Sequence, residues 1–170
     1  MVKTHEEEAT LAKNLLVIIP CGQCKIWKKD PTHGPTKARV AYVGSPFRVN
    51  RVFAERFADK WIILSAKYGL IDPDFIVSKD YDVTFTKPST NPITVDQIKK
   101  QLKDMKSLQG YETVIALGGR KYTDIAKQVF TSFARVLLPT EGLSLFDSMH
   151  KISSLSKLEK AEMLKRITKL

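Results

Sequence analysis

The stretch WIILSAKYGLIDPDFIVSKDYD, residues 61–82, decides the fold class of this chain. It opens with an apolar run, residues 61–64, and then changes abruptly to small, basic and aromatic residues. A short continuous apolar run that stops at glycine is typical of a buried strand leading into a loop. In an open parallel sheet, ligands bind beyond the carboxyl ends of such strands. We therefore predict site residues here, namely Ser65, Lys67, Tyr68 and Gly69.

Three further apolar runs share this design, and they cover residues 15–20, 113–117 and 135–139. Each is continuous rather than alternating, which indicates strands buried on both faces of a sheet. Between the runs, apolar residues recur at helical spacing. We expect helices behind Ser45-Pro46, over residues 94–105 and 122–133, over about residues 156–169, and a short one near residues 6–13. Ser45 is expected as an N-cap, and Thr94 and Ser156 as starts of capping boxes.

Strands and helices that alternate along a chain predict an α/β fold. We expect a three-layer α/β/α sandwich with a mostly parallel sheet of four or five strands, formed by residues 1–170 as a single domain. Two long irregular segments, residues 25–39 and 71–92, are expected to be either functional or disordered.

Composition narrows the class of protein. The 170 residues are 43% hydrophobic and contain no run of roughly 20 apolar residues that could span a membrane. The acidic N-terminus lacks the apolar region of a signal peptide, so a cytoplasmic protein is expected. The net charge of +10 favours a nucleotide or nucleic-acid partner. No motif requires a cofactor.

The loop after the first strand, Cys21-Gly22-Gln23-Cys24-Lys25, is either an ordinary turn or has one of three functional interpretations. A Cys-x-x-Cys pair can carry thiol redox chemistry, although the rest of the chain does not follow a thioredoxin pattern. A zinc site would need two more ligands, and His33 is the only nearby candidate, so we expect no metal. Alternatively, Gly22 lets the backbone approach an anion while Lys25 supplies charge.

Two other segments carry candidate residues. Gly118, Gly119 and Arg120 lead directly into a helix, whose N-terminus favours phosphate or carboxylate. Among the acidic residues that follow the opening strand, Asp82 is the candidate general base. Basic residues near an aromatic ring suit a nucleic-acid backbone with a stacked base. The predicted nucleic-acid contacts are Trp27, Lys28, Lys29, Arg48 and Arg51.

Four motifs together resemble a known family. They are PC[GS]xxK at residues 20–25, YxGxxF at 42–47, ILSAKYGLxxP at 63–73 with Tyr81-Asp82, and GGxxY at 118–122. Over about residues 14–150 the chain resembles small bacterial and archaeal domains related to YaaA-like proteins, which are placed near the uracil-DNA-glycosylase-like fold. Only Gly142 remains of the glycine-rich run that such proteins have after the fourth strand.

The resemblance implies a nucleotide, modified-base or nucleic-acid context, because related domains accompany enzymes of deazaguanine and other base modification. It does not imply glycosylase activity, since the GQDPYH and HPSPLS motifs of uracil-DNA glycosylases are absent. Our first hypothesis is an enzyme that acts on a nucleotide or base at an N-glycosidic bond. Lys67 and Arg120 would hold phosphate, and Tyr68 would stack on the base. Asp82 would be the general base or would stabilise an oxocarbenium-like centre. The alternatives are a non-catalytic nucleic-acid-binding module and a thiol redox protein.

Overall fold

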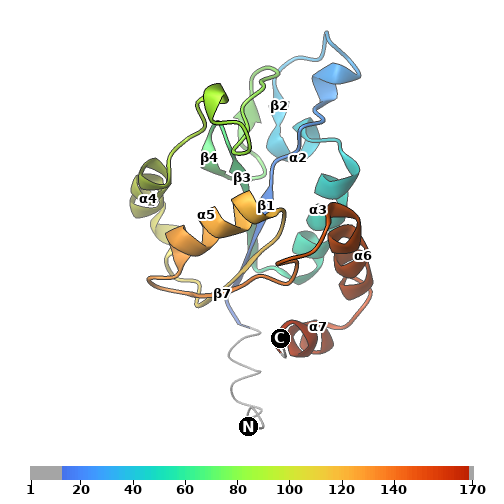
Figure 1. Cartoon of the computed structure of the whole chain (residues 1–170), viewed down its shortest axis with the longest axis vertical. Helices are drawn as coiled ribbons and strands as arrows, with labels where there is room; N and C mark the ends of the chain where they lie inside the picture. Colours follow the sequence, from blue (N-terminus) through green and yellow to red (C-terminus); the bar gives the residue numbers. More distant parts are fainter. Residues whose placement is uncertain (1–12, 169–170) are drawn as a thin grey trace.

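A central five-stranded sheet organises the computed structural model, which describes residues 13–168 (Figure 1). Its strand order is β4-β3-β1-β6-β7. The strands are β1 (Leu15–Pro20), β3 (Lys60–Ser65), β4 (Gly69–Ile71), β6 (Thr113–Ala116) and β7 (Arg135–Leu137). All neighbouring pairs are parallel except β3 and β4, which are antiparallel. The predicted class, a mostly parallel α/β sheet, is confirmed.

Strand β1 lies at the centre of the sheet, and both of its faces are buried. Val17 pairs with Trp61 of β3 on one side and with Ile115 of β6 on the other. Successive side chains of a strand point to opposite faces. Leu15, Val17 and Ile19 accordingly belong to one hydrophobic cluster, and Leu16 and Ile18 to the other.

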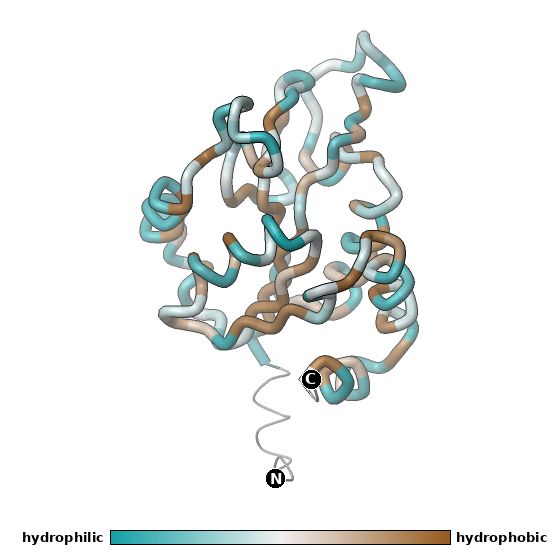
Figure 2. Tube along the Cα trace, viewed as in Figure 1, coloured by the Kyte–Doolittle hydropathy of each residue, from teal (hydrophilic) through white to brown (hydrophobic). Residues whose placement is uncertain are grey.

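Helices cover the two faces of the sheet as two outer layers (Figure 1). The first cluster includes residues of α3 (Ser45–Phe57), α6 (Leu145–Leu155) and α7 (Lys160–Thr168). The second includes residues of α4 (Val95–Asp104) and α5 (Arg120–Phe130). Figure 2 shows hydrophobic residues concentrated along the strands and hydrophilic ones on the outer helices. None of the helices among residues 13–168 is long and apolar enough to cross a membrane.

The two segments expected to be irregular contain short elements. Strands β2 (Thr36–Lys37) and β5 (Ile76–Val77) form a separate antiparallel pair, next to the short helix α2 (Ala38–Ala41). Single 3-10 turns occur at Ile26–Lys28 and Pro88–Thr90 within these segments, and at Lys106–Leu108 after α4. The small pair ties the first long segment to the second.

Several predicted helix ends are wrong. The N-cap of α3 is Gly44, so Ser45 lies within the helix. Ser156 ends α6, where its hydroxyl donates to the Ile152 carbonyl oxygen, and α7 starts only at Lys160. The capping box of Thr94 is confirmed. The short helix expected near residues 6–13 lies almost wholly outside the described residues.

Candidate functional site

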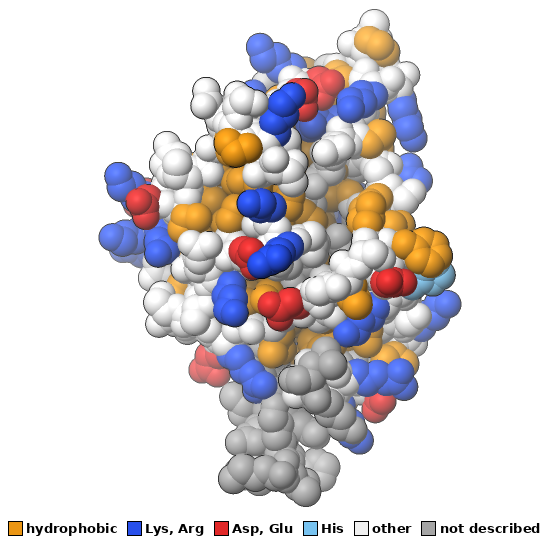
Figure 3. Space-filling model, in the orientation of Figure 1, with side chains coloured by type: hydrophobic (Ala, Val, Ile, Leu, Met, Phe, Trp, Pro, Cys, Tyr) orange, Lys and Arg blue, Asp and Glu red, His pale blue; other side chains and the backbone are white. Residues whose placement is uncertain are grey.

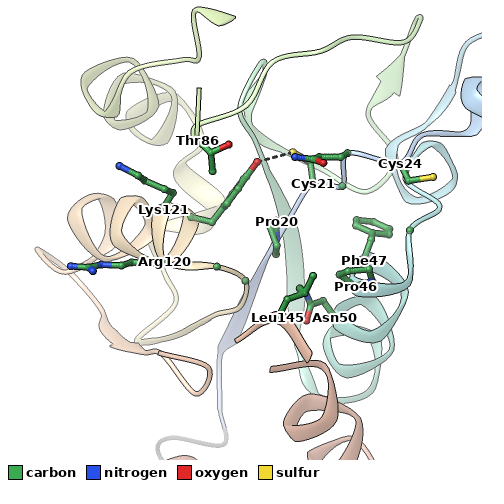
Figure 4. Close-up of a pocket in the computed structure, with 16 residues that line it drawn as sticks. Pro20, Cys21, Cys24, Pro46, Phe47, Asn50, Thr86, Arg120, Lys121 and Leu145 are labelled. Carbon is green, nitrogen blue, oxygen red and sulfur yellow. Dashed lines mark hydrogen bonds between the residues drawn. The ribbon is translucent and has the colours of Figure 1, made fainter. Parts of the chain in front are cut away.

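A cavity lies at the carboxyl ends of β1 and β6. The chain passes from β1 to β3 on one side of β1, and later returns to form β6 on its other side. Ligands of open α/β sheets bind at such a reversal of strand order. A cavity of about 530 Å³, the first cavity, opens there (Figure 4). Its lining comprises Pro20, Cys21, Gly22, Gln23, Cys24, Gly44, Pro46, Phe47, Asn50, Thr86, Gly118, Gly119, Arg120, Lys121, Tyr122 and Leu145.

Gly118 shapes the floor of the first cavity. Its φ angle is +112°, and a Cβ atom built on it would lie 2.6 Å from Cγ of Pro20. Both facts require glycine, because other residues rarely adopt this φ and the space is already filled. Thr140 holds the turn by donating its hydroxyl hydrogen to the Gly118 carbonyl oxygen at 3.2 Å. The close contact brings the ends of β1 and β6 together.

Two helix N-termini face the first cavity. The N-cap residues of α3 and α5 are Gly44 and Gly119, and neither has a side-chain capping hydrogen bond. The first backbone N–H groups of α5 are therefore available to an anion, whereas Pro46 in the first turn of α3 has no N–H to offer. Arg120 adds a cation at the start of α5, and its guanidinium lies 3.7 Å from Asp124. Figure 4 shows this side chain extending away from Cys21.

Asn50 is a polar residue on an otherwise apolar wall. It follows Phe47 by three residues and Pro46 by four, so the three share one face of α3. All three line the first cavity, and Asn50 is only 8% exposed. Sequence reasoning missed this residue. The available signal was a polar residue at a position of the buried helical stripe.

Cys21 and Tyr122 lie where the first cavity meets a second one. The Cys21 sulfur is 3.6 Å from the Tyr122 hydroxyl, drawn as a dashed line in Figure 4. Burial raises the pKa of Tyr122 above its usual value, and a thiolate at Cys21 would raise it further. The phenol therefore stays protonated at neutral pH and can donate a hydrogen bond. Cys21 and Cys24 are both free thiols and half-buried.

The second cavity, also about 530 Å³, is polar and charged. It is lined by Cys21, Gly22, Gln23, Lys25, Lys28, Asp80, Tyr81, Asp82, Val83, Thr84, Thr86, Lys87 and Tyr122. The two cavities share the loop after β1, together with Thr86 and Tyr122. One continuous site thus has an apolar part and a charged part.

Lys25 is the buried cation of the second cavity, with only 4% of its surface exposed. Its Nζ donates to the Tyr81 carbonyl oxygen at 2.9 Å, lies 4.1 Å from the centre of the Tyr81 ring, and is 3.9 Å from an Asp80 oxygen. Burial lowers the pKa of Lys25, while the charges of Cys21 and the nearby carboxylates oppose that effect. The sequence predicted that Lys25 would supply charge to a bound anion. In the structure its amine is already in contact with Tyr81 and Asp80.

Comparison with known proteins places these features in a family. The model of a family of unknown function, DUF6884, matches residues 16–153. This chain belongs to DUF6884. A curated relative, the uncharacterized protein YfjM of Bacillus subtilis, is 37% identical over 124 residues, which is 73% of this chain and 82% of that protein. Both cavities are lined by residues within the matched range.

A solved structure also resembles this DUF6884 domain. It is the crystal structure of AF0587, described as a protein of unknown function, with a TM-score of 0.43 and 15% sequence identity. The similarity covers 90% of this chain, which spans about half, 49%, of the AF0587 chain.

Of the residues predicted around the opening stretch, Ser65, Lys67, Tyr68 and Gly69 line neither of the two cavities. Ser65 is fully buried, and its Oγ accepts from the backbone N–H groups of Lys67 at 3.2 Å and Tyr68 at 3.1 Å. The Tyr68 ring packs against Phe75 and Tyr81. These residues do not form the walls of the site. Ser65 and Tyr68 instead contact Tyr81, which lines the second cavity.

Tyr81 links that support to the second cavity. Its hydroxyl is 3.0 Å from the Ser65 Oγ and also hydrogen-bonds the hydroxyl of Tyr42. Burial raises the pKa values of both tyrosines. Because both phenols stay neutral, the chain of hydroxyls is a structural network that holds the segment bearing Asp80 and Asp82 against the sheet.

The structure separates the predicted nucleic-acid contacts. Trp27 is 8% exposed, and its indole Nε1 donates to the His33 carbonyl oxygen at 2.6 Å. Its ring is therefore not open to the stacked base that the sequence predicted. Arg51 donates to Glu55 and to the carbonyl oxygen of Arg39. The exposed residues of the set are Lys28, Lys29 and Arg48, and of these Lys28 lines the second cavity.

The other predictions divide between the cavities. Cys21, Gly22, Gly118, Gly119 and Arg120 come together around the first cavity, as expected from the strand ends. The exposed Asp82 lines the second cavity. Among residues 13–168, no group of three or more His, Cys, Asp or Glu residues is arranged to hold a metal ion.

Proposed function

We propose that this DUF6884 domain binds a nucleotide in the first cavity, with the phosphate at the N-terminus of α5. The observation that carries the proposal is the position of the cavity, at the reversal of strand order between β1 and β6. Its volume of about 530 Å³ lies within the range of small-molecule pockets. The resemblance of its four motifs to YaaA-like proteins adds support.

The phosphate position follows from the turn before α5. Gly118 and Gly119 bring the backbone close to a ligand, and the uncapped first turn offers N–H groups to an anion. Arg120 is free to reorient, since its side chain is 92% exposed and its partner Asp124 lies on the same helix. The apolar surfaces of Pro20, Phe47 and Leu145 suit the flat part of the ligand.

Titration calorimetry with nucleoside monophosphates tests this function. We expect Arg120→Glu to weaken binding about tenfold or more, because it places a negative charge beside the phosphate. Lys127→Glu makes the same charge change in the last turn of α5, away from the cavity, and should change affinity less than about twofold. Equal effects of the two variants, or no binding to the wild type at millimolar nucleotide, would contradict the proposal.

In this proposal the second cavity supplies the groups that hydrolyse an N-glycosidic bond, with water forming the new bond to the sugar as the bond to the base breaks. Asp82 acts as the general base, and Lys25 offsets negative charge nearby. Mass spectrometry of nucleotides incubated with the protein would detect the released base. We expect release to fall at least about 100-fold in Asp82→Ala, in line with the usual size of general-base catalysis. Asp96→Ala, an exposed carboxylate of α4, is the control. Undiminished release by Asp82→Ala would remove this role.

A second candidate function is binding of a nucleic acid, which the net charge of +10 favours. Lys28 and Lys87 line the second cavity, and Figure 3 shows Lys and Arg side chains spread over the face it displays, with fewer acidic ones between them. Affinity for single-stranded DNA and RNA should then fall steeply as salt rises. Negligible binding at low salt would exclude this function.

A further inference from the structure

The Asn50 side chain is a buried polar group that faces the first cavity. It is 8% exposed. The residues three positions before and after it in α3, Phe47 and Phe53, are buried. Figure 4 shows Asn50 on the same side of the cavity as Pro46 and Phe47. A helix side chain in this stripe would ordinarily be apolar, because burying an amide without a partner is costly.

The Asn50 amide has no hydrogen-bond partner among residues 13–168. Among residues 13–168, the side-chain N or O atom that has neither solvent contact nor a hydrogen-bond partner is Nε of Arg39. The oxygen and nitrogen of the Asn50 amide therefore both keep some solvent-accessible surface. The amide therefore reaches the cavity surface with its donors and acceptor unused. Buried polar groups of folded proteins are almost always hydrogen-bonded, so one that faces a cavity points to a ligand.

The chemistry of the amide defines the ligand group that it can recognise. Asn50 presents an acceptor, Oδ1, and a donor, Nδ2–H, side by side. The complementary group is a planar edge that also carries a donor next to an acceptor, and every nucleobase has such an edge. The apolar neighbours Phe47 and Leu145 provide surfaces for the ring faces.

We propose that Asn50 is the specificity-determining residue of the first cavity and that it hydrogen-bonds the edge of a nucleobase. This assignment rests on the proposed function, and it adds the base to the phosphate. The N-terminus of α5 and the Asn50 wall of α3 line the same cavity from different helices. A nucleotide can therefore place its phosphate near Gly119 and its base against Asn50.

Titration calorimetry of UMP, CMP, AMP, GMP, IMP and base-free ribose 5-phosphate tests the assignment. In Asn50→Ala, the affinity of the best nucleotide relative to ribose 5-phosphate should fall about tenfold or more, because the base contact is lost. Ribose 5-phosphate itself should bind within about twofold of its wild-type affinity. Val52→Ala, an exposed position of the same helix at 56% exposure, is the matched control and should leave all ratios unchanged.

Asn50→Asp gives a sharper readout with nearly the same shape. A carboxylate accepts but does not donate, so it favours a base with two adjacent donors. GMP has these at N1 and at the 2-amino group, whereas IMP lacks the 2-amino group. The GMP-to-IMP affinity ratio should rise about tenfold over the wild type. This variant also carries the test if Asn50→Ala does not fold.

The outcomes separate the two proposals. If the wild type binds neither the nucleotides nor ribose 5-phosphate, the proposed function and the Asn50 assignment both fall. If it binds nucleotides and both Asn50 variants keep the wild-type preference, the Asn50 assignment alone is overturned. Equal weakening of every ligand, including ribose 5-phosphate, would give Asn50 a purely structural role and would also overturn it.

Discussion

Gly69→Ala should destabilise the fold severely, and the structure gives the reason. Gly69 has a φ of +75°, and a Cβ atom there would lie 2.1 Å from Oε1 of Gln101. Gln101 spans the turn, since its Oε1 accepts from Leu70 N at 3.1 Å and its Nε2 donates to the Tyr68 carbonyl oxygen at 2.7 Å. The left-handed conformation costs alanine about 1–2 kcal/mol. Losing both hydrogen bonds adds about 1–3 kcal/mol, for a total of about 2–5 kcal/mol.

A double-mutant cycle with Gln101→Ala separates strain from collision. Gln101→Ala alone should cost about 1–3 kcal/mol, because it loses both hydrogen bonds. In the double variant the collision partner is gone, so the total cost should be about 1–3 kcal/mol smaller than the sum of the single variants. Urea unfolding followed by circular dichroism measures all four free energies of unfolding. Costs that add to within about 0.5 kcal/mol would refute the contact with Gln101 as the reason for glycine.

Three further predictions concern the second cavity and its junction. Burial lowers the pKa of Lys25 from 10.5, so the unfolded chain binds that proton more tightly than the folded chain. The free energy of unfolding should therefore rise with pH between the lowered pKa and 10.5. Lys25→Met should lack this rise when urea unfolding is measured at several pH values. With Cys24→Ser, Cys21 is the sole thiol, and bound nucleotide should slow its iodoacetamide alkylation at least about threefold; an unchanged rate would place the ligand elsewhere. Tyr81→Phe, which loses two hydroxyl partners, should cost about 1–3 kcal/mol in thermal or urea unfolding, against less than about 0.5 kcal/mol for Tyr68→Phe.

The strands could be predicted from sequence because burial dictates their composition. A strand covered on both faces, such as β1, has no position for a polar side chain, and its apolar run is therefore continuous. The turn at Gly118-Gly119 into α5 was predictable for a related reason, since a strand end followed at once by a helix needs residues that permit a sharp turn.

Helix α6 and strand β4 were not predicted because their apolar signal is weak. In α6 the buried residues Ile152 and Leu155 lie near its end, while Leu145 and Phe146 are 65% and 69% exposed. No continuous stripe marks such a helix. Strand β4 has only three residues and directly follows the turn at Gly69, so its reversal along β3 depends on long-range contacts such as the one with Gln101.

The candidate site was predicted only where backbone conformation defines it. Glycines at strand ends can be recognised from sequence, whereas the burial of a side chain depends on what packs over it. Trp27 and Lys25 look like surface residues in a basic segment, yet both are buried beneath the segments that fold over them. For Asn50 the opposite holds. A polar residue within an apolar helical stripe can be recognised in the sequence, but it indicates a binding site only once the structure places it beside a cavity.

The two proposals together place the bond between base and sugar near the junction of the cavities. With phosphate at the start of α5 and the base against α3, the sugar lies over the loop of Cys21 and Gly22, which both cavities share. The glycosidic bond then faces the charged second cavity, where Asp82 lies. A nucleotide bound the opposite way would put its phosphate against Asn50, which has no charge to match it. Under these proposals the orientation of the ligand decides whether Asp82 can reach the bond, and Asn50 would select that orientation.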